Sequence, residues 1–151
     1  MNRHTPKEHL TTYDSDFYQW SLHQAALVRE RRFSELDLEN IAEEIESLGR
    51  SDRRSLASHM IILVAHLLKW QFQSGKRSTS WDHSIFMARL KIAEIIAESP
   101  SLSAYPASEL ANIYGSARKL AAKETKLKLE TFPVVCPYPI SKILDETFMP
   151  D

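Results

Sequence analysis

Apolar residues recur along this chain at intervals of three and four, which is the spacing of one face of an α-helix. No stretch alternates strictly between apolar and polar residues, and no Asn-Gly or Asp-Gly pair indicates a β-hairpin. The pattern therefore predicts an all-α protein. We expect five main helices and a short sixth, packed as an antiparallel helical bundle in a single domain over residues 13–150.

Capping residues divide the first half of the chain into three predicted helices. A polar tail over residues 1–12 is expected to be flexible, and the first helix is expected over about 14–31. Ser34 would cap a second helix, with apolar residues at Leu38, Ile41, Ile45 and Leu48, and Gly49 would end it. Ser51 would cap a third helix that runs to about Phe72. From Met60 to Leu68 that helix is apolar except at His66, so we expect neighbours to cover it on all sides.

The second half of the chain predicts two more helices and an arm. Ser78 or Ser80 would cap a fourth helix, which Pro100 stops. Its predicted buried face carries Trp81, Ile85, Ala88, Ile92 and Ile95. A fifth helix is expected from about Pro106, with Leu110, Ile113, Ala117 and Leu120 on one stripe. After Thr125 the proline-rich segment "KLKLETFPVVCPYP" predicts an extended arm over the surface, and residues 140–145 predict one last helical turn.

Composition excludes several classes of function. The 151 residues carry 19 basic and 20 acidic side chains, which argues against extensive binding to DNA or to an anionic membrane. The three glycines lie far apart, so no phosphate-binding loop is expected, and the single cysteine excludes a disulfide or a cysteine-rich zinc site. With no signal peptide or membrane span in the pattern, we expect a cytoplasmic protein, and the sequence predicts no cofactor.

Seven segments, in this order along the chain, carry a family resemblance. They are "DFYQW" from Asp16, "LDLENIAEEIESLGR" from Leu36, "HLLKWQFQ" from His66, "STSW" from Ser78, "SPSL" from Ser99, "FPVVCPY" from Phe132 and "ILDETFMP" from Ile143. Together they resemble the bacterial family catalogued as domain of unknown function 29, which is abundant in cyanobacteria and present in proteobacteria. The resemblance implies a single all-helical bacterial domain, and it implies no activity or catalytic residue.

Two groups of residues could form a polar site. Glu44 is the acidic residue of the second predicted helix that is best placed to reach inward, where it could serve as a ligand or general base. The alternative is that Glu44 belongs to a solvated acidic face. His59 and His66 lie on one helical face, and Glu44 or His83 could complete a metal site with them. The alternative for a core histidine is a hydrogen bond to a carboxylate or a backbone carbonyl.

Two further motifs suggest RNA chemistry or stacking. "RSLASH" places Arg54 and His59 at the spacing of HEPN-type ribonucleases, in which the histidine serves as acid or base and the arginine stabilises phosphate charge. "HLLKWQFQSGKRSTSW" combines Trp70, Arg77 and Trp81, and Arg89 follows one helix later. These four residues could bind a base or a charged group, whereas the helical spacing of both tryptophans favours core packing.

The sequence favours a protein-interaction module without catalytic activity, with an unknown protein partner or with a second copy in a homodimer; nucleic-acid and membrane partners are not favoured. The alternative is a HEPN-like ribonuclease or a metal-assisted hydrolase that uses His59, His66, Glu44 and Arg54. An interaction module should expose an apolar patch of a few hundred Å², on the scale typical of binding surfaces. An enzyme should open Glu44 and a histidine into one shared cleft.

Overall fold

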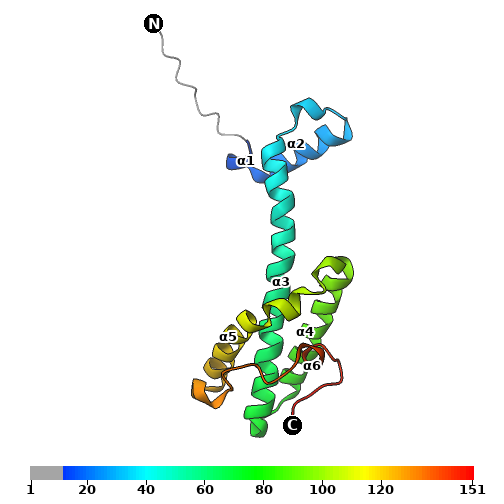
Figure 1. Cartoon of the computed structure of the whole chain (residues 1–151). Coiled ribbons are helices and arrows are strands. Elements are labelled where there is room, and N and C mark those ends of the chain that lie inside the picture. Colours follow the sequence, from blue (N-terminus) through cyan, green and yellow to red (C-terminus); the bar gives the residue numbers. More distant parts are fainter. Residues whose placement is uncertain (1–11) are drawn as a thin grey trace. The chain divides into compact units, whose positions relative to one another are not determined.

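The described part of the chain, residues 12–151 of a computed structural model, contains six α-helices and no strand (Figure 1). The helices are α1 (Thr12–Ser15), α2 (Phe17–Arg29), α3 (Leu38–Phe72), α4 (Thr79–Glu98), α5 (Tyr105–Thr125) and α6 (Ile140–Ile143). The all-α prediction is therefore confirmed. None of the helices in this part is long and apolar enough to cross a membrane.

Backbone contacts group the chain into two compact units, one up to Gly49 and one from Arg50 to Asp151, and we describe each by itself. The predicted flexible tail over residues 1–12 lies outside the described residues, apart from Thr12 at the start of α1. The assignment of residues 13–150 to a single domain stays a prediction.

The boundary predicted at Gly49 is wrong, because the second and third predicted helices form one helix, α3. A glycine ends a helix by adopting a left-handed conformation, and no described glycine has a positive φ. Ser51 therefore caps nothing, and Ser34 lies in a 3₁₀ turn, Phe33–Glu35. The residue that starts α3 is Asp37, whose backbone carbonyl accepts the first helical hydrogen bond from Ile41 N–H at 2.9 Å.

The first predicted helix is also divided, into α1 and α2. Asp16 separates them, and its carboxylate accepts a hydrogen bond from the backbone N–H of Gln19 at 3.0 Å. An aspartate at this position satisfies one of the N–H groups that a helix start leaves without a partner. The capping signal was therefore present in the sequence, two residues after the predicted start.

Because Gly49 lies inside a helix, replacing it with alanine is expected to stabilise the protein. A Cβ atom built at Gly49 has no heavy atom within 4 Å, so the new methyl group meets no obstacle. Gly49→Ala should raise the free energy of unfolding by about 0.4–1 kcal/mol, because alanine loses less backbone freedom on folding. Urea denaturation followed by circular dichroism measures this change.

Gly115→Ala in α5 is the matched control, since its Cβ is equally unobstructed. Both variants should show gains of similar size. A loss of stability in Gly49→Ala alone would mean that the helix is interrupted at Gly49, as the sequence pattern suggested.

In the unit of residues 12–49, the core is small. Trp20, Gln24 and Leu27 of α2 are its buried residues. The indole Nε1–H of Trp20 donates to the Asp37 carboxylate at 3.0 Å, and the side-chain carbonyl of Gln24 accepts from Asp37 N–H at 2.9 Å. These two bonds join α2 to the start of α3.

In the unit of residues 50–151, the second part of α3 packs against α4, α5 and the C-terminal arm. Leu56, Met60, Leu63, Val64, Leu67 and Leu68 of α3 are fully buried. The predicted faces of the fourth and fifth helices supply Ile85, Ala88, Ile92, Ile113 and Ala117 to the same core. Coverage of α3 is incomplete, however: Ile62 is exposed and His66 is half-buried, so the expectation that neighbours cover it on all sides is wrong.

The C-terminal arm is extended only in part, because Leu129–Thr131 form a 3₁₀ turn, and it does not only run over the surface. Phe132, Tyr138 and Ile143 of the arm are buried in the core, and the predicted last turn of helix is α6. Backbone carbonyls of the arm accept hydrogen bonds from helix side chains: Arg118 Nε–H donates to Phe132 at 3.0 Å, and the Tyr114 hydroxyl donates to Pro133. The arm is thus a part of the bundle.

Candidate functional site

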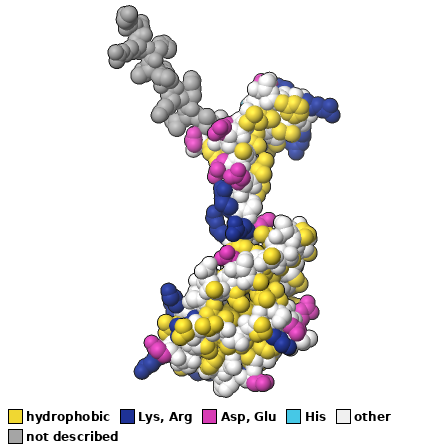
Figure 2. Space-filling view, viewed as in Figure 1, with side chains coloured by type: hydrophobic (Ala, Val, Ile, Leu, Met, Phe, Trp, Pro, Cys, Tyr) yellow, Lys and Arg dark blue, Asp and Glu magenta, His cyan; other side chains and the backbone are white. Residues whose placement is uncertain are grey.

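Exposed apolar side chains gather on the unit of residues 12–49 (Figure 2). They come from α2, the following turn and the first part of α3, and the largest exposed ones are Phe17, Tyr18, Leu22, Val28, Phe33, Leu38, Ile45 and Leu48. A unit with three buried residues leaves most of its apolar area uncovered. Apolar surface concentrated in this way marks an interaction site more often than it marks an ordinary surface.

Four of the apolar residues form a regular line on α3, which we call the α3 strip: Leu38, Ile41, Ile45 and Leu48. Their spacing of three, four and three is that of the a and d positions of a coiled coil. Leu38, Ile45 and Leu48 are 66%, 64% and 70% exposed, whereas Ile41 is half-buried. The sequence pattern identified this line of residues correctly, but a line at that spacing cannot show whether the same chain covers it.

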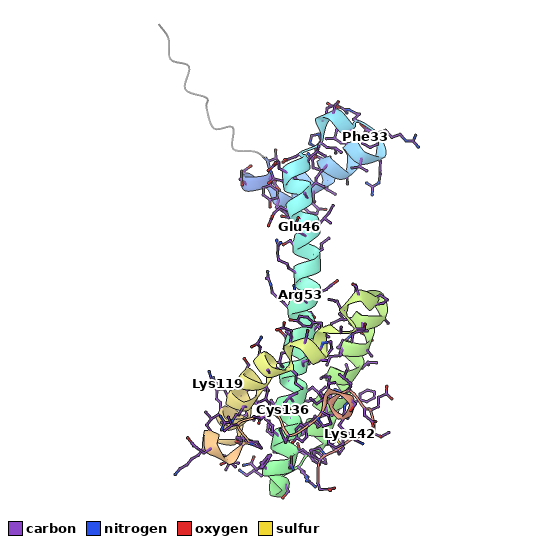
Figure 3. All side chains as sticks on the ribbon, in the orientation of Figure 1. Phe33, Glu46, Arg53, Lys119, Cys136 and Lys142 are labelled. Carbon is purple, nitrogen blue, oxygen red and sulfur yellow. The ribbon has the colours of Figure 1, made fainter. Side chains whose placement is uncertain are left out.

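Acidic side chains lie beside the α3 strip. Glu39, Glu43 and Glu46, which we call the acidic rim, line a shallow hollow of about 340 Å³ together with Leu38 and Ala42; Figure 3 labels Glu46 on α3. Residues 12–49 include nine acidic residues and three arginines. One of these arginines, Arg32, forms ion pairs with Glu30 and Glu35. The unit of residues 12–49 is therefore acidic as a whole.

Two carboxylates of this unit serve internal hydrogen bonds. Glu44 accepts a hydrogen bond from the Tyr13 hydroxyl at 2.6 Å, and that bond raises the pKa of Tyr13 to about 12. The pKa of Asp37 lies below its ordinary value because the side chains of Asn40 and Trp20 both donate to its carboxylate. Glu44 therefore acts as the partner of a tyrosine in the packing of α1 against α3.

The three predicted histidines have different surroundings. The Nδ1–H of His66 donates to the backbone carbonyl of Ile62 one turn earlier, at 2.8 Å, and burial lowers the pKa of the imidazole. His59 is half-buried on α3, about 10 Å along the helix axis from His66, and His83 is exposed on α4. Within residues 12–151, no group of three or more His, Cys, Asp or Glu side chains could hold a metal ion.

The structure does not bring Arg54 and His59 into one site. Five residues of helix turn the second side chain about 140° away from the first, because each residue advances about 100°. Arg54 lines a hollow of about 250 Å³ with Arg50, Arg53, Ala57 and Tyr105, and His59 is not one of the lining residues.

The basic and aromatic residues at the corner between α3 and α4 contact one another. The Lys69 ammonium lies 4.7 Å from the centre of the Trp81 ring and pairs with Glu124 at 2.7 Å. The Arg77 guanidinium lies 5.0 Å from the centre of the Trp70 ring, and its Nε–H donates to the Trp70 carbonyl at 2.8 Å. One face of each indole is thus covered by a cation of the same chain.

One groove is lined both by a predicted metal ligand, His83, and by a predicted binding residue, Arg89. It has a volume of about 310 Å³ between α4 and the C-terminal segment, and its lining residues are Asp82, His83, Ile85, Phe86, Arg89, Leu90, Glu146 and Met149. His83 and Arg89 were predicted as a ligand and a binding residue, whereas Glu146 and Met149 had no signal in the sequence. Arg89 has a structural role, because its guanidinium donates hydrogen bonds to the backbone carbonyls of Ile143 at 2.9 Å and Phe148 at 2.8 Å.

These features define a small all-α protein with an exposed apolar helix face and an acidic rim. The chain belongs to the family described as Domain of unknown function DUF29, whose model matches residues 12–149. Comparison with curated proteins and comparison with solved structures each found no match.

Proposed function

We propose that this protein is an interaction module that acts without catalysis, and that the α3 strip is its binding surface. The observation that carries the proposal is the exposure of Leu38, Ile45 and Leu48 at coiled-coil spacing on one regular helix. Apolar residues at this spacing receive the matching face of another helix. The hollow beside the strip is lined, among the described residues, by carboxylates and apolar side chains alone, whereas a catalytic site brings groups of different roles together.

The partner that fits this surface is an amphipathic helix of another protein with Lys or Arg beside its apolar face. Its apolar face would cover the α3 strip, and its cations would lie opposite the acidic rim of Glu39, Glu43 and Glu46. Opposite charges at the edge of such an interface speed association and exclude wrong partners. A second copy of this unit would bring one acidic rim towards another, which disfavours a homodimer through the same surface.

Binding can be tested with the full chain and a synthetic helical peptide as the probe. The peptide carries leucines at a and d positions and lysines beside them, and a control peptide carries the same leucines with glutamates. Fluorescence anisotropy should show binding of the lysine peptide and much weaker binding of the glutamate peptide. The triple variant Leu38→Gln/Ile45→Gln/Leu48→Gln should weaken binding by at least about tenfold, because each lost apolar contact removes about 1 kcal/mol or more.

The double variant Val134→Gln/Val135→Gln is the matched control, because it removes two exposed apolar side chains from the C-terminal arm. It should bind the peptide as the natural chain does. Equal binding of both peptides, or of the triple variant and the natural chain, would contradict the proposal. If light scattering shows a dimer that the triple variant abolishes, a second copy is the occupant and the basic-helix proposal is wrong.

A further inference from the structure

Three arginines lie on one side of α3 in the unit of residues 50–151. Arg50, Arg53 and Arg54 are exposed, and with Ala57 and Tyr105 they line the hollow of about 250 Å³. Dark blue side chains are gathered on this part of α3 in Figure 2, and Figure 3 labels Arg53. Successive residues advance about 100°, so the three side chains fall within a sector of about 100° around the helix.

Tyr105 holds one of these arginines in place. The Arg53 guanidinium carbon lies 5.1 Å from the centre of the Tyr105 ring. The ring is itself fixed, because Tyr105 is half-buried at the first residue of α5 and the next residue, Pro106, is fully buried. Stacking of this kind orients the flat guanidinium and lowers the entropy that it loses when it binds a ligand.

The hollow also lies beside the beginning of α5, because the first residue of that helix, Tyr105, lines it. Tyr105 starts a helix of 21 residues, and its N-cap residue, Ala104, makes no side-chain hydrogen bond to the helix start. The N-terminus of a helix carries partial positive charge and favours anions. Arg53 and Arg54 both line the hollow, so an anion bound there meets two guanidinium groups.

We propose that Arg53 and Arg54, beside Tyr105, bind a phosphate group, either the free ion or a small phosphate ester. A guanidinium donates two parallel N–H bonds, and phosphate presents enough oxygens to accept from two arginines at once. The hollow has the size of a small group rather than of an extended polyanion, and the chain as a whole carries a formal charge of −1. This site uses none of the residues of the α3 strip, so it stands independently of the proposed function.

Nuclear magnetic resonance of the ¹⁵N-labelled full chain tests this site. Inorganic phosphate and glycerol phosphate are added separately at constant ionic strength, with chloride as the balancing anion. The Nε–H signals of Arg53 and Arg54, and the backbone amide signals of Ala57 and Tyr105 beside them, should move and saturate with phosphate. In the variant Arg53→Gln/Arg54→Gln, phosphate should affect the Ala57 and Tyr105 amides at least about tenfold more weakly, because charge-assisted bidentate bonds are lost.

Lys119→Gln/Lys123→Gln is the matched control, since it removes the same number of charges from exposed positions of α5. It should leave phosphate binding unchanged. Saturation by both probes would identify the phosphate group itself as the ligand, and saturation by glycerol phosphate alone would identify an ester. Signals that drift without saturation, or Ala57 and Tyr105 amide signals that respond equally in the arginine variant, would overturn the site.

Discussion

Phe132→Ala should lower the free energy of unfolding by about 3–5 kcal/mol, as removal of a fully buried aromatic ring does. The Phe132 side chain is 1% exposed, and its ring meets the Phe72 ring edge to face with centres 5.6 Å apart. The substitution leaves a cavity in the core and releases the point where the arm enters it. Denaturation with urea, followed by circular dichroism, gives the change directly.

Phe86→Ala provides the matched control, because the same atoms are removed from a side chain that is 61% exposed. Its effect should stay within about 0.5 kcal/mol, as for most surface substitutions. Phe132→Leu should fall between the two, since it retains most of the volume. If Phe132→Ala costs no more than Phe86→Ala, the arm does not belong to the folded core.

Arg89→Met is expected to lower the free energy of unfolding by about 2–4 kcal/mol, because buried carbonyl groups lose their donors. Arg89 is 6% exposed, and its guanidinium donates to the carbonyls of Ile143 at 2.9 Å and Phe148 at 2.8 Å. Weaker bonds of 3.5 Å reach Lys142 and Glu146. The loss should be local as well as global, so amide hydrogen exchange in residues 142–150 should quicken.

The variant Arg89→Lys tests whether the positive charge or the planar shape of the guanidinium stabilises the protein. Lysine keeps a positive charge and a long stem, but one ammonium cannot reproduce the planar fork that serves several carbonyls. It should therefore rescue stability only in part. Lys91→Met, at an exposed position of the same helix, should leave exchange in residues 142–150 unchanged. Unaltered exchange in Arg89→Met would show that other contacts hold the segment.

Helical spacing predicted a large part of this fold, because it is a local property. Ile85, Ala88 and Ile92 were expected on one buried face and are buried. The N-cap of α4 was expected at Ser78 or Ser80, and Ser78 accepts a hydrogen bond from Trp81 N–H at 3.2 Å. In each case the pattern that gave the prediction joins residues within one or two helical turns.

The error at Gly49 has a different origin. A glycine permits both the left-handed conformation that ends a helix and the helical conformation that continues it. The side chains before and after Gly49 favour a helix equally, so the local signal was ambiguous. Asp37 was a better marker than Ser34, because an aspartate at a helix start accepts a hydrogen bond from a backbone N–H of the first turn, and the Asn40 backbone bonds to the Asp37 carboxylate.

The candidate sites also combine features that the local sequence predicts with contacts that only distant chain segments supply. Trp70, Arg77 and Trp81 were visible as a cluster in the sequence, and they do contact neighbouring residues at one corner. Some of their contacts depend on chain segments far away: Arg77 also donates to the Pro150 carbonyl at 3.5 Å, and Lys69, which covers the Trp81 ring, pairs with Glu124. The groove beside α4 could not be predicted, since one wall is formed by Glu146 and Met149 of the C-terminal segment.

The sequence alone determined the all-α class, the family and the apolar line of Leu38, Ile41, Ile45 and Leu48, because residue type and spacing are enough for these. Only the tertiary structure decided that this line is exposed, that the arm enters the core and that Arg89 serves backbone carbonyls. Burial and hydrogen-bond partners depend on which distant segments meet. Helical periodicity carries no information about that meeting.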